Sequence, residues 1–509
     1  MKKLLIIITA LLVFTSTISN AQQSSAPSFI RDSLDSYVER ALRDWQLPGL
    51  AICIVKGDEI ILKGYGVQES GKNVRIDENT LFMIGSNTKA MTATALAMLQ
   101  DRKKLSLDDK VVKWLPSFTM KDPWVTKELN LRDLLCHRIG METFQGDFMY
   151  WTSNLDEKQV MEKFGRLTPA YSFRSKWGYT NASFVVAGAV ICAASGKSWA
   201  DFLTDSIFRP LGMNRTIALS KNLPDASNKA SAHTLNQDQQ LVVIPYCNID
   251  NLGPAGSVSS SVSDMSKWVT MLLKNGKFND KQVVSSNGIS QTWFPNSVLS
   301  SGGHMFNKVN YLLYGLGWML NDYNGKRVIS HTGGVNGFVT SVTLIPEEKL
   351  GIIVLTNSDH NGLYEAVKSE IMDAYLNLPY RNYSNIYLTS TKQQRLQSAN
   401  NWKKKFDTVA MHKNTTLPLS AYAGDYTHDV YGAIKITSKT DHLDLSFEHH
   451  PALLGKLEPL GGDRFICTYN DPVFGRKIIP FKTENGKVKS MTLSVADFVE
   501  FTTYEFVKK

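Results

Sequence analysis

The stretch FMIGSNTK at residues 82–89 and the run TKAMTATALAML at 88–99 decide the fold expected of this chain. The second run is rich in Ala, Met and Leu and holds no glycine or proline, so it predicts a buried helix. Upstream, the apolar runs at 49–55 and 60–65 flank the turn KGDE, which predicts a β-hairpin. Ser86 therefore stands between a predicted hairpin and a predicted buried helix.

Ser86 is the only serine in the chain that has a lysine, Lys89, three residues further on. Residues i and i+3 share one face of a helix, so the amine of Lys89 can meet the Ser86 oxygen. A desolvated lysine has a lowered pKa and can accept the hydroxyl proton, and free N–H groups at the helix start favour developing negative charge. The structural alternative is an N-cap serine with an exposed lysine.

Two later stretches carry further chemistry. In WGYTN at 177–181, Tyr179 offers a phenol for proton relay and Asn181 offers an amide for hydrogen bonding to a substrate. In SHTGG at 330–334, the glycines let backbone N–H groups approach a substrate closely, as an oxyanion hole requires. Taken singly, each stretch also fits an ordinary turn.

The remaining pattern predicts two domains. Strands are expected at 315–318, 338–345 and 350–356, and helices dominate between 101 and 250, which predicts one sheet assembled from distant parts of the chain. Residues 381–416 are polar, with a helix expected at 392–406. Short alternating segments from 421 to 507 predict a small β-sandwich or barrel.

In chain order, S-x-x-K, Y-x-N and [K/H]-T-G resemble the motifs of the serine β-lactamase/penicillin-binding-protein superfamily. The similarity is to the class C-like branch, which includes D,D-peptidases, D-aminopeptidases, esterases and acyltransferases. It covers residues 28–379, with further landmarks at 47–49, 134–138, 253–260 and 314–318. It implies a β-lactamase/transpeptidase-like α/β (α+β) fold, with an antiparallel sheet flanked by helices and an all-helical region. The C-terminal domain resembles the small lipocalin-like barrels of some D-peptidase-like members.

The resemblance also implies roles for the catalytic residues. Ser86 would attack a carbonyl carbon to form an acyl-enzyme. Lys89 and Tyr179 would share the general-base and general-acid work, with the division between them open. Asn181 would hold the amide side of the substrate.

The third motif supplies the implied binding residues. His331 stands where β-lactamases usually carry lysine, facing the substrate carboxylate, and a neutral imidazole binds a carboxylate less firmly than a fixed cation does. Thr332 and Gly333 would line the pocket. The backbone N–H groups of Ser86 and Gly334 would form the oxyanion hole. No cofactor and no metal site are expected.

The N-terminus has the features of a signal peptide. Lys2 and Lys3 precede the apolar run 4–14, and the small-residue segment after it places cleavage after Ala21, so we expect a secreted, periplasmic protein without a stable membrane span.

The formal charge of +9 is scattered, without a dense basic block, so no nucleic-acid partner is expected. The expected organisation is a signal peptide at 1–21, a β-lactamase-like domain at 22–380, a linker at 381–416 and a small β-barrel domain at 417–509.

The leading function is a secreted serine hydrolase that cleaves a small ester or amide, such as a D-peptide, an ester or a β-lactam-like substrate. One alternative is an acyltransferase that passes the acyl group to an alcohol acceptor such as a sterol or sugar. A second alternative is a non-catalytic penicillin-binding sensor. The expected partner is a small molecule or short peptide, and the C-terminal domain offers a route to oligomerisation.

Overall fold

An eight-stranded antiparallel sheet forms the centre of the N-terminal domain, in the order β2-β1-β14-β13-β12-β11-β10-β9. The computed structural model describes residues 26–411 and 414–509, so the predicted signal peptide lies outside the described residues. The strands of this sheet are β1 Gly49–Lys56, β2 Glu59–Gly66, β9 Ser297–Ser301, β10 Tyr311–Tyr314, β11 Met319–Tyr323, β12 Lys326–Val335, β13 Phe338–Ile345 and β14 Leu350–Thr356. Ile52 of the first hairpin lies opposite Val354, which confirms that distant parts of the chain build one sheet.

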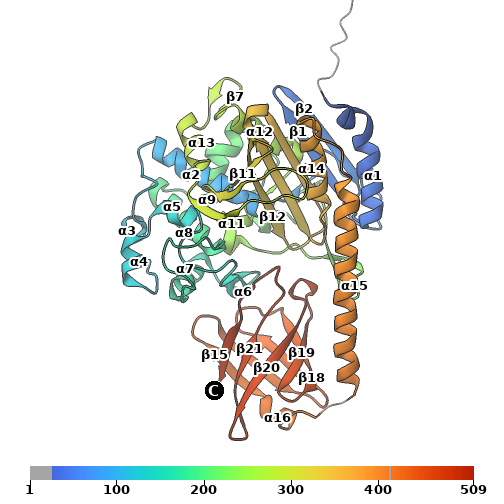
Figure 1. Cartoon of the computed structure of the whole chain (residues 1–509). Coiled ribbons are helices and arrows are strands. Elements are labelled where there is room, and N and C mark those ends of the chain that lie inside the picture. Colours follow the sequence, from blue (N-terminus) through green and yellow to red (C-terminus); the bar gives the residue numbers. More distant parts are fainter. Residues whose placement is uncertain (1–25, 412–413) are drawn as a thin grey trace, which may run out of the picture.

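Helices cover both faces of this sheet (Figure 1). Successive side chains of a strand point to opposite faces, and β1 is apolar at every position from Gly49 to Val55. Leu50, Ile52 and Ile54 therefore pack toward α1 (Leu34–Trp45) and α14 (Leu363–Tyr375). The alternate residues join the larger core on the other face, where α2 (Thr88–Asp101) and α12 (Val262–Leu273) lie.

The helical region lies between β2 and β9 in the chain. Its helices are α2 Thr88–Asp101, α3 Val111–Trp114, α4 Pro123–Glu128, α5 Leu131–Leu135, α6 Asp147–Tyr150, α7 Glu157–Arg166, α8 Asn181–Ser195, α9 Trp199–Leu203, α10 Arg209–Leu211, α11 Gly253–Gly256, α12 Val262–Leu273 and α13 Ser286–Thr292. Helix α2 is buried from Thr88 to Leu99, which confirms the buried helix expected there. It packs against α8 and α11, so the helix that follows Ser86 lies in the middle of the domain.

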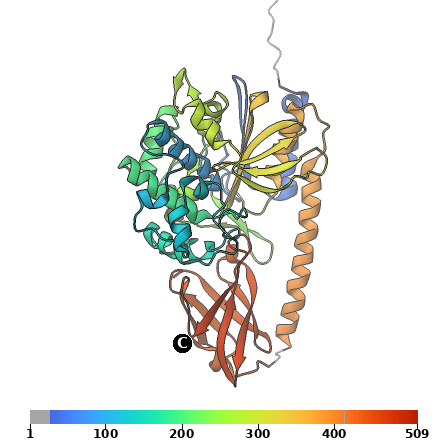
Figure 2. The same cartoon turned by 60° about the vertical axis from the view of Figure 1, so that its left-hand side comes forward.

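The segment predicted as a linker contains one long helix, α15 (Tyr383–Ala410), which extends beyond the expected 392–406 on both sides. Its first turn is anchored in the N-terminal domain, where Trp45 Nε1 donates to Ser384 Oγ over 3.0 Å. Beyond Leu388 no residue of α15 is buried. Figures 1 and 2 show α15 running beside the N-terminal domain and then beside the barrel.

The C-terminal domain is a closed eight-stranded antiparallel barrel. Of the two architectures predicted for this region, a small sandwich or a barrel, the structure shows the barrel. Its strands are β15 Gly424–His428, β16 Gly432–Ser438, β17 Leu443–Phe447, β18 Leu454–Gly461, β19 Arg464–Tyr469, β20 Arg476–Glu484, β21 Lys487–Leu493 and β22 Tyr504–Lys508. Along β16, Ile434 and Ile436 are buried and Lys435 between them is exposed. This alternation fills the barrel with apolar side chains.

The strand expected at Gly315–Trp318 is wrong: these residues form the turn between β10 and β11. The N–H of Gly315 donates to the carbonyl of Trp318, and Gly317 has a φ of +72°. A Cβ on Gly317 would lie 2.7 Å from the carbonyl oxygen of Lys89. The glycines therefore serve a tight turn against α2, and the apolar residues between them give this turn a pattern like that of a strand.

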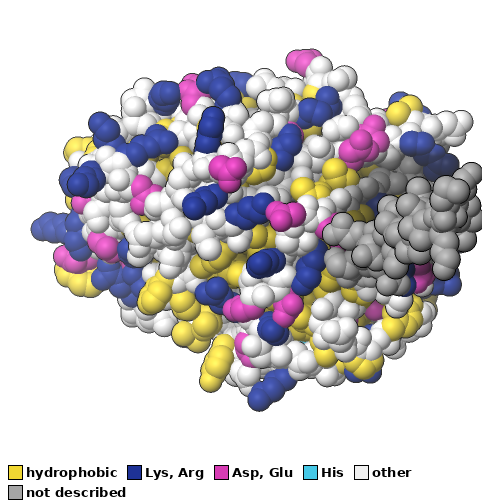
Figure 3. All heavy atoms as spheres, turned by 90° about the horizontal axis from the view of Figure 1, so that it is seen from above, with side chains coloured by type: hydrophobic (Ala, Val, Ile, Leu, Met, Phe, Trp, Pro, Cys, Tyr) yellow, Lys and Arg dark blue, Asp and Glu magenta, His cyan; other side chains and the backbone are white. Residues whose placement is uncertain are grey.

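Within the described residues, no single helix is long and apolar enough to cross a membrane. The helices Asn181–Ser195 and Trp199–Leu211 are long and apolar enough only when they are taken together, and the chain bends by 73° between them. The first of these helices is buried in the domain core over most of its length. On the face away from the barrel, Figure 3 shows basic and acidic side chains interspersed.

Candidate active site

Ser86 lies in the short helical turn Gly85–Asn87 that leads into α2. Strand β12 runs directly against this turn: a Cβ on Gly85 would lie 3.0 Å from the nitrogen of Gly334, and one on Gly333 would lie 1.9 Å from the oxygen of Ile84. Any side chain at 333 would therefore push the strand away from the serine. The structure thus brings Ser86 and the second expected oxyanion-hole residue together.

Lys89 is fully buried and its amine has three partners. Nζ lies 2.6 Å from Asn181 Oδ1, 2.9 Å from the carbonyl oxygen of Ala255 and 3.0 Å from Ser86 Oγ. Burial lowers the pKa of Lys89 to about 7, and the charge of Asp147 opposes this fall. A neutral amine has two hydrogens and one lone pair, so it can donate to both oxygen acceptors and turn its lone pair toward the Ser86 hydroxyl.

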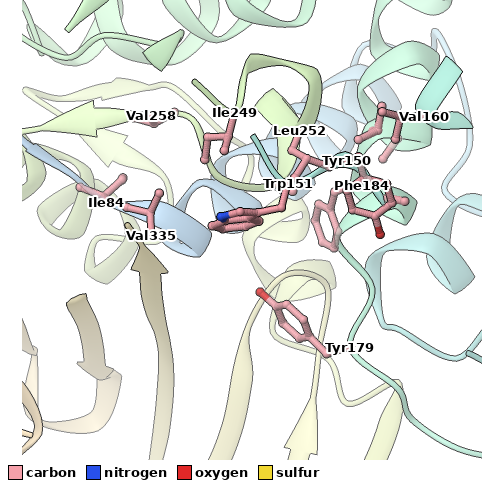
Figure 4. Close-up of a cluster of buried hydrophobic side chains, with 14 of the residues drawn as sticks. Ile84, Tyr150, Trp151, Val160, Tyr179, Phe184, Ile249, Leu252, Val258 and Val335 are labelled. Atoms are coloured by element: carbon pink, nitrogen blue, oxygen red, sulfur yellow. The ribbon is translucent and has the colours of Figure 1, made fainter. Parts of the chain in front are cut away.

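Tyr179 completes the group around the serine. The amine of Lys89 lies 4.7 Å from the centroid of its ring. Burial raises the pKa of the Tyr179 phenol, and a hydrogen bond with Ser86 opposes this rise. Figure 4 shows the hydroxyl end of Tyr179 pointing toward the indole of Trp151. The phenol therefore keeps its proton at neutral pH and is available as a donor.

Asn181 uses both ends of its amide inside the protein. Its oxygen accepts from Lys89, and its Nδ2 donates to Asp147 Oδ2 over 2.6 Å. Asp147 also accepts a hydrogen bond of 2.7 Å from Tyr150, and burial raises the pKa of its carboxyl to about 7. Asn181 therefore links the lysine to a buried carboxyl group, in addition to the substrate contact implied by the resemblance.

His331 belongs to a second buried network beside Tyr179. His137 Nδ1 accepts from the backbone N–H of Thr180 over 3.1 Å, so Nε2 carries the proton of a neutral imidazole and faces the Tyr314 hydroxyl at 3.2 Å. Tyr314 in turn lies 2.9 Å from His331 Nε2, and His331 Nδ1 lies 2.6 Å from the carbonyl oxygen of Thr332. Burial lowers the pKa of His331 to about 3, so the ring is neutral. Both of its nitrogens are occupied within the protein, whereas the Thr332 side chain is exposed.

The barrel also reaches the site, through the segment 494–503 between β21 and β22. A Cβ on Gly334 would lie 3.4 Å from the ring of Phe498. The ring of Phe498 meets Trp151 edge to face at 6.3 Å, and Phe501 stacks on Phe144 at 5.3 Å. Phe144 in turn contacts Tyr179 at 5.6 Å. Aromatic side chains from both domains therefore lie beside Gly334 and Tyr179.

Sequence reasoning missed Asp147 and the barrel segment 494–503. Asp147 is the first residue of the short helix α6, in a stretch without a recognised motif, and its contact with Asn181 joins positions that are 34 residues apart. The one local sign is Gly146, whose φ of +94° starts the short helix α6. The barrel segment is recognisable only once the two domains are placed against each other.

Fold and site together define a serine hydrolase with a β-lactamase/transpeptidase-like fold and a C-terminal antiparallel barrel. The family model described as Beta-lactamase matches residues 34–376, so the chain belongs to the Beta-lactamase family. A second model, described as a domain of unknown function, DUF3471, matches residues 410–508, which include the whole barrel.

Relatives resemble the chain over most of its length, and solved structures share its fold. The unguisins hydrolase ungD' of Aspergillus campestris is 28% identical over 440 residues, which cover 82% of this chain and 79% of the relative. The octameric penicillin-binding protein homologue of Pyrococcus abyssi superposes with a TM-score of 0.59 at 20% identity, covering 93% of this chain and 99% of the other. A D-stereospecific amidohydrolase from Streptomyces gives a TM-score of 0.55 at 20% identity, covering 67% of this chain and 97% of the other.

Proposed function

We propose that this protein forms an acyl-enzyme on Ser86 and hydrolyses a small amide or ester, with peptides that contain D-amino acids as the substrate class. The observation that carries the proposal is the buried amine of Lys89, which is 3.0 Å from Ser86 Oγ and whose other two partners are oxygen acceptors. With its pKa lowered to about 7, this amine is a competent base at neutral pH.

The reaction begins when Lys89 takes the Ser86 proton as Oγ attacks the substrate carbonyl carbon. The N–H groups of Ser86 and Gly334 stabilise the oxyanion. The tetrahedral intermediate then collapses, the bond to the leaving amine or alkoxide breaks, and Tyr179 passes a proton to the leaving group while Lys89 returns one to the phenol. Water attacks the acyl-enzyme by the same proton path in reverse, which releases the acid and restores the serine.

Two features support a D-peptide or a related amide as substrate. The name of the Aspergillus campestris relative describes a hydrolase, and that of the Streptomyces protein of the same fold describes a D-stereospecific amidohydrolase. Both nitrogens of the buried His331 are paired within the protein, so the site lacks the fixed cation that a lysine would present at this position to a substrate carboxylate.

The test compares hydrolysis of D- and L-amino-acid p-nitroanilides and of p-nitrophenyl esters by the wild type, Ser86→Ala and the control Ser36→Ala. Ser36 is exposed on α1, so its loss should change nothing. We expect Ser86→Ala to abolish turnover and the D-anilides to be preferred over the L-anilides. Unchanged turnover in Ser86→Ala would refute the acyl-enzyme, and a preference for L-anilides would refute the substrate class.

Secretion is part of the proposal. The segment 1–21 has the charged, apolar and small-residue parts of a signal peptide, with cleavage after Ala21. Expression in a Gram-negative host followed by mass spectrometry of the periplasmic fraction should give a mature chain that begins at Gln22. A full-length chain retained in the cytoplasm would refute it.

Acyl transfer is the second candidate, and the position of Phe498 favours it. This apolar side chain of the barrel lies beside Gly334 and contacts Trp151, so it shields the place where the acyl group would sit from water. Turnover of a p-nitrophenyl ester with increasing concentrations of an alcohol would test this, with Phe498→Ala for comparison. Transfer predicts a product ester in the wild type and a larger share of hydrolysis in Phe498→Ala; release of free acid alone from both would reject transfer.

A further inference from the structure

The short helix α6 and the residue before it are held by a carboxylate from the other domain. The N–H groups of Gly146 and Phe148 each donate to Glu500 over 2.8 Å, one to each carboxylate oxygen. Glu500 belongs to the barrel segment 494–503, more than 350 residues further along the chain. The barrel therefore fixes the backbone on both sides of Asp147.

Glu500 is buried and surrounded by hydrogen-bond donors. The hydroxyl of Tyr431 donates to it over 3.1 Å, and the hydroxyls of Tyr504 and Thr502 also donate to it. Burial raises the pKa of Glu500 to about 8, while the bonds from Thr502 and from the two backbone N–H groups oppose this rise. A buried carboxyl group is costly unless donors satisfy it, so five converging donors mark a built site.

A phenyl ring of α6 also inserts into the barrel. Phe148 is buried and stacks on His450, with ring centroids 4.7 Å apart and a 4° angle between the planes. Around it stand three more barrel side chains, Tyr431, Phe447 and Phe474. Phe148 thus turns toward the barrel, whereas its neighbour Asp147 turns back toward Asn181.

Asp147 connects this anchored backbone to the catalytic lysine. Its Oδ2 accepts from Asn181 over 2.6 Å, and the oxygen of Asn181 accepts from Lys89 over 2.6 Å. A displacement of α6 would therefore move Asp147, release Asn181 to rotate and change the direction of the lysine amine. Small displacements of this kind are costly, because proton transfer requires the lone pair of Lys89 to face the Ser86 hydroxyl.

We propose that Glu500 of the C-terminal barrel is a positioning residue of the acyl-transfer site, which acts through Gly146 and Phe148 on Asp147 and so on Asn181 and Lys89. The proposal rests on the proposed function, because catalysis at Ser86 is what it positions. It assigns the barrel a role in the chemistry itself, in addition to the contacts that Phe498 and Phe501 make beside the site.

The main variant is Glu500→Gln, which keeps the shape of the side chain. Its amide nitrogen must face the N–H of Gly146 or that of Phe148, so one of these bonds is replaced by a repulsive contact. The matched control is Lys163→Met, which removes another bond between the domains, the one from Lys163 Nζ to the Val430 carbonyl at 2.7 Å. Both variants loosen the domain contact, but only the first touches the backbone beside Asp147.

We expect kcat of Glu500→Gln on a small p-nitrophenyl ester to fall about 10- to 100-fold with KM nearly unchanged, and Lys163→Met to keep the wild-type kcat. In a double-mutant cycle, Asp147→Asn combined with Glu500→Gln should lose little more than Asp147→Asn alone, because both act through one chain of contacts. A merely structural role predicts additive losses. Additive losses, an unchanged kcat in Glu500→Gln, or equal losses in Glu500→Gln and Lys163→Met would overturn the proposal.

Labelling with a fluorophosphonate, read by mass spectrometry of the Ser86 peptide, separates this proposal from the proposed function. An unlabelled wild type would refute the function itself, whereas equal labelling rates in the wild type and Glu500→Gln would refute only the positioning role. If Glu500→Gln fails to fold, Tyr431→Phe removes a single donor to Glu500 and decides instead. Its labelling should be slowed severalfold, and a wild-type rate would overturn the proposal.

Discussion

Two polar networks meet at Tyr179, and they differ in how they hold protons. On one side, Lys89, Asn181 and Asp147 form a chain whose two ionisable ends both have pKa values of about 7. On the other side, His137, Tyr314 and His331 form a chain of neutral groups. Both chains are buried within one domain, so burial alone does not explain the difference.

The difference lies in what each chain connects. In the histidine network every ring nitrogen has a fixed partner. The network ends at the backbone N–H of Thr180 and at the backbone carbonyl of Thr332. Burial lowers the pKa of both imidazoles, so neither gains a proton near neutral pH. The lysine network instead ends at the Ser86 hydroxyl. The histidine network fixes the shape of the site, and the lysine network is able to move a proton.

The strongest test of this contrast removes the amine from the lysine network. Lys89→Met keeps the length and apolar character of the side chain and takes away the base, so kcat/KM on a p-nitrophenyl ester should fall about 10³- to 10⁴-fold. Thermal unfolding at pH 8 or above should change little, because the amine, with its pKa lowered to about 7, is mostly neutral there and its burial costs little charge desolvation. Lys104→Met, at an exposed position, is the control. Activity within tenfold of the wild type would show that Lys89 is not the base.

The pH profile gives the next largest effect. The lysine must be neutral to accept the Ser86 proton, and its pKa is lowered to about 7, so kcat/KM should rise with pH and level off above this value. At two pH units below the midpoint the activity should be about 100-fold lower, since each unit reduces the neutral fraction tenfold. Initial rates between pH 5 and 9 test this, with circular dichroism to verify folding. A flat profile across pH 7 would contradict it.

Much of the site could be predicted from local sequence. Ser86 and Lys89 lie three residues apart where α2 begins, so helical spacing was enough to pair them. Tyr179 lies just before α8, which begins at Asn181, and this pair was recognised from its short motif and the family resemblance. The hairpin, the buried helix after Ser86 and the strands at 338–345 and 350–356 were also predicted correctly, because each has a strong local hydrophobic pattern. The strand at 315–318 failed because glycines in a tight turn gave a similar pattern.

What could not be predicted depends on contacts between distant segments. His331 was expected to face a substrate, yet both of its nitrogens are paired through Tyr314 and Thr332, one of them with a residue 17 positions away. Asp147 and Glu500 belong to different domains and lie more than 350 residues apart. No local pattern marks such residues, because a buried carboxyl group is recognised by its donors, and these come together only in the folded chain.

The mildest test perturbs the histidine network. Tyr314→Phe removes the hydroxyl between the two rings and leaves Nε2 of His137 and Nε2 of His331 unpaired, which should cost about 1–3 kcal/mol of unfolding free energy for each buried group. Because no base is lost, kcat/KM should fall only severalfold, and the midpoint of the pH profile should stay at about 7, the value set by Lys89. Urea unfolding and the pH profile measure the two effects, with Tyr311→Phe on the exposed end of β10 as control. A midpoint that moved by a full unit would show that the two networks are one, and that the neutral histidines also take part in proton transfer.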